Sequence, residues 1–114
     1  MRCFAEISVL VHATEDLDKV YGALLRTFGE LPYVIEPLEG HYGNPIYLIT
    51  AFMDDCRPLL SKLCPLLAGR GLEPRGELYV RLDKQRLARG ELALSNSDDV
   101  VRIRIKGGKC GEGN

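Results

Sequence analysis

Hydrophobic and polar residues alternate from residue 3 to residue 11, and this period of two predicts a β-strand. One face of that strand is apolar and consists of Cys3, Ala5, Ile7, Val9 and Val11. Residues 77–83 and residues 100–106 alternate in the same way, whereas residues 46–53 form an almost uniformly apolar run. These three segments predict three further strands.

Two shorter segments predict the remaining strands. Residues 32–38 have an extended character, and Pro37 limits them to an edge or an end of a sheet because proline cannot donate a ladder hydrogen bond. Residues 91–95 predict a second short strand, preceded at residues 83–90 by a charged turn or a short helical link. The polar, glycine-punctuated residues 39–45 predict a tight loop.

Two other segments carry apolar residues at helical spacing. In the first, Thr14 is a good N-cap, Glu15 and Asp16 lie where a helix dipole favours negative charge, and Gly29 predicts the end. Its apolar positions are Leu17, Val20, Leu24, Leu25 and Phe28.

The second helix can be capped by Asp54 or Asp55, and Pro65 predicts a kink or an early break in it. It carries a leucine stripe that fits either a core face or a dimer face, made of Leu59, Leu60, Leu63, Leu66 and Leu67.

Together these elements predict an α+β fold, with a largely antiparallel sheet backed by two helices in the order β-α-β-β-α-β-β-β. Residues 1–106 are expected to form a single domain. Residues 107–114 offer no apolar stretch, so we expect them to be a disordered C-terminal tail.

Composition and charge narrow the class of protein. The 114 residues are 46% hydrophobic and 27% charged, as in one soluble globular domain, and the formal net charge is −1. That total excludes a strongly basic nucleic-acid-binding protein but not a locally basic face. No apolar run reaches the ~20 residues that span a bilayer, and no signal-peptide pattern opens the chain, so we expect a cytoplasmic protein. Three Asn and one Gln favour a thermophilic source.

The four cysteines, Cys3, Cys56, Cys64 and Cys110, form no C-x-x-C pair, which excludes zinc-ribbon and thioredoxin motifs on spacing. Reduced thiols are the default in a cytosolic protein, although hyperthermophiles are an exception. We therefore expect buried thiols at Cys3, Cys56 and Cys64.

The clearest chemical asymmetry is a basic row on one face of residues 100–106, formed by Arg102, Arg104 and Lys106. Tyr79 and Arg81 share that face if the two strands belong to one sheet. Arginines pair with phosphates and aromatic rings stack on bases, so such a face suits RNA. Lys84, Arg86 and Arg89 could extend the patch. The alternative is a solvated sheet face whose arginines pair with Glu77 or Glu91, or block edge-to-edge aggregation.

His12 with Glu15 and Asp16, together with His41, forms a second constellation that could bind a metal or act as acid and base. No H-x-x-x-H or H-E-x-x-H spacing exists, so we expect hydrogen-bonded loop residues and no metal centre. Gly40 and Gly43 predict a tight turn, because no P-loop lysine follows them. Neither a cofactor nor an enzyme activity is expected.

Three strings carry a family resemblance: His12 to Asp16 (H-A-T-E-D), residues 40–45 (G-H-Y-G-N-P), and Asp83-Lys84-Gln85 with the closing basic strand. From about residue 3 to 106 the chain resembles a small archaeal family of predicted RNA-binding proteins with a proposed link to the exosome. The resemblance implies a fold similar to the large-subunit ribosomal protein L-five family, and a homodimer. It also implies a polar motif site, comprising His12, Glu15, Asp16, His41, Tyr42 and Asn44.

The sequence and the resemblance together favour a non-enzymatic RNA-binding module in an RNA-processing complex. We expect phosphate contacts from Arg81, Lys84, Arg102, Arg104 and Lys106, and base stacking on Tyr79 and Tyr42. We also expect His12 and His41 to lie close together, with Asn44 and Lys84 nearby.

Two alternatives stay open. One is a protein-interaction or scaffold subunit that uses the leucine stripe and the sheet edge at residues 32–38. The other is a small hydrolase or nuclease that uses His12, His41 and Asp16.

Overall fold

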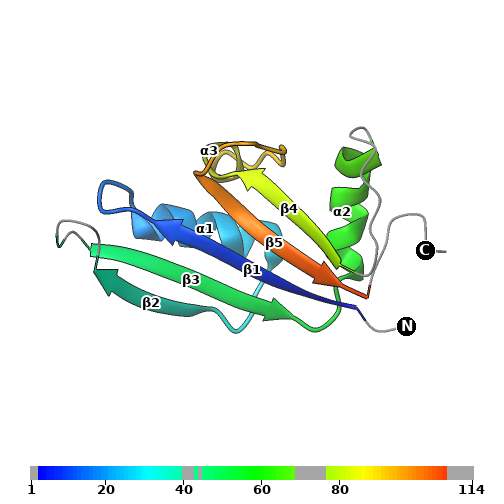
Figure 1. The fold of residues 1–114 in the computed structure, drawn as a ribbon, viewed down its shortest axis with the longest axis horizontal. Coiled ribbons are helices and arrows are strands. Elements are labelled where there is room, and N and C mark those ends of the chain that lie inside the picture. Colours follow the sequence, from blue (N-terminus) through cyan, green and yellow to red (C-terminus); the bar gives the residue numbers. More distant parts are fainter. Residues whose placement is uncertain (1–2, 40–42, 44, 69–76, 108–114) are drawn as a thin grey trace.

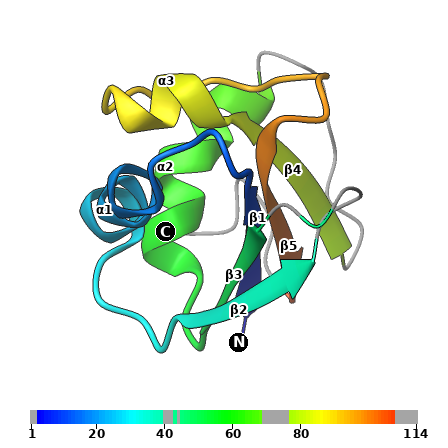
Figure 2. The same ribbon diagram turned by 90° about the vertical axis from the view of Figure 1, so that its left-hand side faces the viewer.

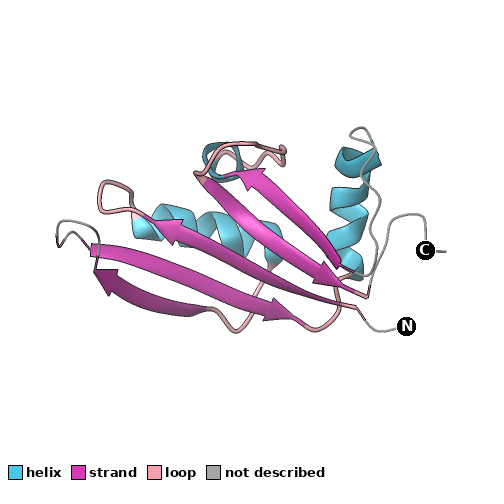
Figure 3. Cartoon of the chain, in the orientation of Figure 1, coloured by secondary structure: helices cyan, strands magenta, loops and turns pink. Residues whose placement is uncertain are grey.

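Five strands form one antiparallel sheet in the order β2-β3-β1-β5-β4 (Figure 1). The computed structural model describes residues 3–39, 43, 45–68 and 77–107. Its elements are β1 (Phe4–Val11), α1 (Leu17–Phe28), β2 (Val34–Glu39), β3 (Pro45–Met53), α2 (Arg57–Ala68), β4 (Glu77–Asp83), α3 (Lys84–Ala88) and β5 (Val100–Lys106). The predicted α+β class and the antiparallel sheet are confirmed, with three helices instead of two (Figure 3).

All three helices lie on the same side of the sheet (Figure 2). The core lies between these layers, because the apolar side of each alternating strand faces the helices. Ile7 and Val9 of β1, Ile103 of β5 and Leu24 of α1 are each at most 1% exposed. The opposite side of the sheet is covered by none of the three helices, and we call it the outer face.

Helix α1 begins two residues later than the N-cap prediction placed it. Its N-cap is Asp16, not Thr14, and the Asp16 carboxylate accepts the backbone N–H of Asp18 at 2.9 Å. The predicted end at Gly29 is confirmed: this C-cap has a φ of 83°, which glycine adopts without strain, and its N–H donates to the Leu25 carbonyl.

Helix α2 runs through Pro65 to Ala68, so the prediction of an early break is wrong. Proline removes one helical N–H from the last turn, and the carbonyl of Ser61 that would have accepted it belongs to an exposed residue. The leucine stripe belongs to the core, since Leu59, Leu60, Leu63 and Leu67 are buried. The stripe is therefore not a dimer face.

Residues 91–95 do not form the predicted strand. They contribute one isolated bridge, Leu94 to Leu82, and two backbone bonds to β4, in which Asp83 donates to Ala93 and Ser95 donates to Arg81. This segment lies along the outer edge of β4. The short helical link predicted before it is confirmed as α3.

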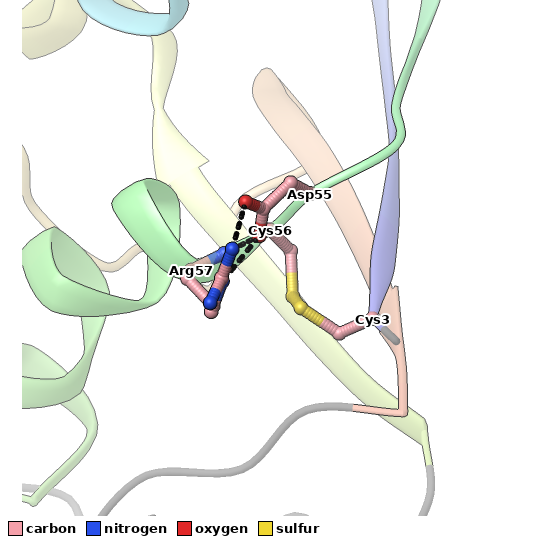
Figure 4. Close-up of a disulfide and its surroundings, with 4 residues drawn as sticks. All are labelled: Cys3, Asp55, Cys56 and Arg57. Carbon is pink, nitrogen blue, oxygen red and sulfur yellow. Dashed lines mark hydrogen bonds and ion pairs between the residues drawn. A yellow bond between two sulfur atoms is a disulfide. The ribbon is translucent and has the colours of Figure 1, made fainter. Parts of the chain in front are cut away.

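Cys3 and Cys56 form a disulfide, which joins the residue before β1 to the residue before α2 (Figure 4). None of the described cysteines is a free thiol, so the expectation of reduced thiols at Cys3, Cys56 and Cys64 is wrong. Beside this bond, Arg57 donates to the Asp55 carboxylate from its backbone and its guanidinium, and these hydrogen bonds hold the pKa of Asp55 at about 2. No helix in the described part of the chain is both long and apolar enough to cross a membrane.

Candidate nucleic-acid interface

The pairing register places the predicted basic residues in rows across the outer face. Because β4 pairs with β5, Tyr79 and Arg81 do share a sheet face with the arginines of β5. One row runs from Arg81 through Arg102 to Ser8 and Thr50. The next row runs from Tyr79 through Arg104 to Glu6 and Phe52. The third joins Glu77, Lys106 and Phe4.

Arg81 and Arg102 face one another directly across β4 and β5, and both are exposed. Within the described part of the chain, neither side chain has an ion pair or a hydrogen bond. Like charges in directly opposed positions of an antiparallel pair destabilise the sheet. An anion bound between the two guanidinium groups would offset that repulsion.

The other two cations of the basic row have carboxylate partners on the same face. Arg104 Nη2 lies 3.4 Å from Glu6 Oε1, and Lys106 Nζ lies 3.1 Å from Glu77 Oε1. These four side chains are between 34% and 45% exposed, so solvent weakens both pairs and a phosphate could displace either carboxylate. Of the four cations described on this face, Arg81 and Arg102 are thus free of partners in the described chain, whereas Arg104 and Lys106 are internally paired.

Tyr79 projects from β4 with 65% of its surface exposed. Its hydroxyl donates to Glu77 Oε2 at 2.8 Å. The hydrogen bond from Tyr79 and then the Lys106 ammonium lower the pKa of Glu77, while Glu77 raises the pKa of Tyr79. At neutral pH Glu77 is therefore an anion that anchors the far end of the ring, leaving the ring itself open to solvent.

A hollow of about 380 Å³ lies on this part of the outer face. Its lining includes Tyr79, Arg81, Arg102, Arg104, Glu6 and Ser8. That volume is at the lower end of small-ligand sites. The hollow thus combines two unpaired guanidinium groups with an open aromatic ring.

Lys84 does not belong to this face, which corrects the prediction that it contacts phosphate. It is 3% exposed, and its Nζ donates at 2.7 Å to the Leu10 carbonyl and at 2.7 Å to Glu15 Oε1. Asp99 Oδ1 forms a further ion pair with it at 2.6 Å. Lys84 is already neutralised by two carboxylates and cannot reach an external anion.

Among the described residues, His12, Glu15 and Asp99 form a group whose ligand atoms lie within 4.8 Å of one another. The Lys84 ammonium already supplies the positive charge that a cation would bring to the two carboxylates. Glu15 is further held by the backbone N–H of His12. The group is therefore a salt-bridge network that joins β1, α3 and the chain just before β5.

The Lys84 network makes acid stability depend on Asp99. Burial raises the pKa of Asp99, but the hydrogen bond and charge of Lys84, helped by Gln85 and His12, outweigh it and lower that pKa below its ordinary value. A depressed carboxyl pKa contributes stability that is full above the ordinary pKa and is lost as pH falls through the folded one. We expect Asp99→Asn to cost about 1 kcal/mol at neutral pH, and the difference from wild type to shrink as the pH falls below about 4 and to vanish only when Asp99 is protonated in the folded protein. Urea titrations at a series of pH values measure it; a pH-independent difference would contradict this origin.

The polar motif site is only partly described. Asp16 acts as the N-cap of α1, and exposed His12 lies beside Glu15 at the end of β1. His41, Tyr42 and Asn44 lie outside the described residues, and so does the expected proximity of His12 to His41. Lys84 does lie near His12, as expected, because both contact Glu15.

Sequence reasoning missed three residues that matter here. Asp99 reads as a turn residue, and nothing local connects it with Lys84. Phe4 and Phe52 are exposed on the outer face. The sequence feature that could have identified them is a large apolar residue at a position that alternates with the buried positions of β1 and β3.

These features define an α+β protein with helices on one side of an antiparallel sheet and an open, arginine-bearing face on the other. Residues 5–107 match the model of a family described as RNA binding, and the chain belongs to this family. The chain is 33% identical to the RNA-binding protein PAB1135 of Pyrococcus abyssi, over 88% of this chain and 78% of that protein.

Two solved structures resemble the fold. A DUF54 protein of Methanothermobacter thermautotrophicus, Mth689, has a TM-score of 0.79 at 27% identity, covering 93% of this chain and 85% of that one. Protein SSO0741 of Sulfolobus solfataricus has a TM-score of 0.71 at 28% identity, covering 90% and 86%. The suspected archaeal family of RNA-binding proteins is thus confirmed.

Proposed function

We propose that this protein binds RNA through the outer face, at the hollow between β4 and β5. The observation that carries the proposal is the opposed pair Arg81 and Arg102, two exposed guanidinium groups without a carboxylate partner in the described chain. A phosphate placed between them receives charge-assisted hydrogen bonds and relieves their mutual repulsion. The RNA-binding description of the family supports RNA as the ligand.

The neighbouring residues complete this contact. Tyr79 offers an open ring on which a base adjoining the phosphate can stack. Arg104 and Lys106 bind adjacent phosphates only by exchanging Glu6 and Glu77 for them, so their contribution is smaller. Lys84 contributes nothing directly, because it is buried. The protein acts in this proposal as a binding module and performs no chemistry on the RNA.

The test replaces both arginines with a neutral residue of similar length. We expect Arg81→Gln/Arg102→Gln to weaken binding of a fluorescein-labelled RNA by about 10- to 100-fold at low salt, through the loss of two charge-assisted contacts. The slope of log K against log salt should fall by about 0.7 if the pair shares one phosphate, and by about 1.4 if it holds two. Fluorescence anisotropy across a salt series measures both quantities.

The matched control is Lys19→Gln/Arg89→Gln, which removes the same charge from exposed positions on α1 and just after α3. Its affinity and salt slope should equal those of the wild type apart from a small general charge effect. If both double variants weaken binding equally, RNA affinity depends on the net charge of the protein and not on the outer face. If the wild type binds no RNA at low salt, the proposal fails.

The edge of the sheet does not favour the alternative of a scaffold subunit. All residues of β2 are exposed, and β2 is an edge strand as Pro37 predicts. However, Pro37, Glu36 and Glu39 are features that prevent edge-to-edge strand pairing. The homodimer, the exosome association and the cytoplasmic location implied earlier stay predictions.

A further inference from the structure

Two phenylalanines project from the outer face into solvent. Phe4 of β1 is 42% exposed and Phe52 of β3 is 52% exposed. In both strands the buried residues alternate with them, so the rings point away from the helices. Exposed large apolar side chains that lie together on a strand face mark interaction sites more often than solitary ones do.

The two rings are neighbours. Phe52 pairs with Glu6 across β3 and β1, and Phe4 lies two residues before Glu6 on the same side of β1. This diagonal relation brings large side chains within reach of one another. Both rings, together with Cys3 and Asp54, line a hollow of about 400 Å³. We call it the phenylalanine hollow.

The hollow lined by Tyr79, Arg81, Arg102 and Arg104, which we call the arginine hollow, lies on the same surface as the phenylalanine hollow, and the two meet at β1. Glu6 lines the arginine hollow, and the same residue pairs with Phe52 on its other side. From β4 to β3 the outer face spans three interstrand spacings, about 14 Å. Sheets of this width that bind RNA stack two or three bases on their aromatic side chains.

The two hollows differ in the charge of the side chains that line them. The arginine hollow carries two unpaired cations, whereas the described residues that line the phenylalanine hollow include Asp54 and no cation. A carboxylate repels phosphate, but it accepts hydrogen bonds from the amino groups of bases. Aromatic rings beside a carboxylate therefore suit the base of a nucleotide whose phosphate lies elsewhere.

We infer that Phe4 and Phe52 stack on unpaired bases of the RNA whose phosphate is held by Arg81 and Arg102, so that the preferred substrate is single-stranded RNA. The inference rests on the proposed function and adds the class of RNA to it. A base in a duplex has both faces covered by its neighbours and cannot stack on a protein ring. A flexible single strand can cross the sheet from β4 to β3 and offer its bases to both rings.

The experiment compares one labelled RNA octamer, alone and annealed to its complement. The wild type should prefer the single strand. We expect Phe4→Ala/Phe52→Ala to lose single-strand affinity roughly 10- to 100-fold, while its salt slope stays that of the wild type because no phosphate contact is removed. Phe4→Tyr/Phe52→Tyr keeps both rings and should bind within about threefold of the wild type. Ile35→Ala, which removes an exposed apolar side chain from the helix side of β2, is the control and should not change binding.

A direct readout of stacking is available because the chain contains no tryptophan. In Phe52→Trp the single indole reports on the phenylalanine hollow. Addition of the single-stranded octamer should quench its fluorescence with the same midpoint as the anisotropy titration.

The outcomes separate this inference from the proposed function. If Phe4→Ala/Phe52→Ala binds like the wild type while Arg81→Gln/Arg102→Gln does not, base stacking is wrong and the RNA-binding face stands. If the alanine variant changes only self-association in sedimentation velocity, the phenylalanine hollow is a protein interface and the inference is overturned. If the wild type binds neither RNA, both the inference and the proposed function fail.

Discussion

Replacing Lys84 with methionine is expected to lower the free energy of unfolding by about 3–5 kcal/mol, which is the range for breaking a buried ion pair by removing one partner. The ammonium group of Lys84 is buried and bonds the Leu10 carbonyl and Glu15, and it pairs with Asp99. Methionine keeps most of the packing volume but leaves two carboxylates facing each other without a counter-charge. Urea unfolding followed by circular dichroism measures the change.

The position of these contacts explains why one side chain matters so much. Leu10 is the penultimate residue of β1, Glu15 lies in the turn before α1, and Asp99 lies just before β5. Lys84 itself begins α3 and directly follows β4. A single ammonium group therefore holds together the chain segments that leave and enter three adjacent strands at this end of the sheet.

Two comparisons test this explanation. Lys19→Met changes an exposed lysine of α1 and should shift stability by no more than about 0.5 kcal/mol. Glu15→Gln combined with Lys84→Met removes one of the stranded carboxylates and should recover part of the loss. A Lys84→Met variant that kept wild-type stability but lost RNA affinity would show instead that Lys84 contacts phosphate.

The same residue shows where prediction from sequence stops. Lys84 stands among charged residues directly after a strand, and such a pattern indicates a solvated lysine. Its burial is decided by Glu15 and Asp99, which are 69 and 15 positions away, and no local period relates the three. Contacts of this kind arise only when the sheet order β1-β5-β4 is assembled.

The basic face was predictable because its causes are local. Alternation alone assigns Arg102, Arg104 and Lys106 to one side of β5, and one further assumption, that β4 and β5 share a sheet, adds Tyr79 and Arg81. Sequence pattern could not tell which of these cations are paired. That depends on the register, which puts Glu6 beside Arg104 but places Arg102 opposite another arginine.

Removing the Cys3–Cys56 disulfide is expected to have the second large effect. The bond connects positions separated by 53 residues. In the chain-entropy account, a closed loop of this length stabilises the fold by about 4 kcal/mol, since it restricts the unfolded chain. Cys3→Ala/Cys56→Ala should therefore unfold roughly 15 °C below the wild type by calorimetry. Alanine is the suitable replacement because both sulfur atoms are in the core, where a serine hydroxyl would need a partner.

Mass spectrometry supplies the matching chemical test. In protein digested without reductant, the peptides that contain Cys3 and Cys56 should remain linked, and an alkylating reagent should label neither residue. Ser61→Ala/Thr27→Ala, at positions on α2 and α1 outside the core cluster, is a control that should change the melting temperature by only a few degrees. If the cysteine variant melts with the wild type while the peptides are linked, the loop closure does not stabilise the fold.

The position of the disulfide predicts which segments lose the most protection from hydrogen exchange when the bond is removed. The bond fixes the start of α2 to the start of β1, and it is reinforced by the Cys56 N–H, which donates to the Cys3 carbonyl at 3.4 Å. Without it, the start of α2 keeps only the backbone hydrogen bond from residue 56 to residue 3 and the packing of its buried leucines. Hydrogen exchange of Cys3→Ala/Cys56→Ala should therefore rise most in the first turns of α2 and at the start of β1.

Exchange in β4 and α3 should follow only the global loss of stability, because the Lys84 network at the opposite end of the sheet is intact. A uniform rise across the whole sheet would mean that the disulfide acts on the unfolded chain alone and does not hold α2 locally.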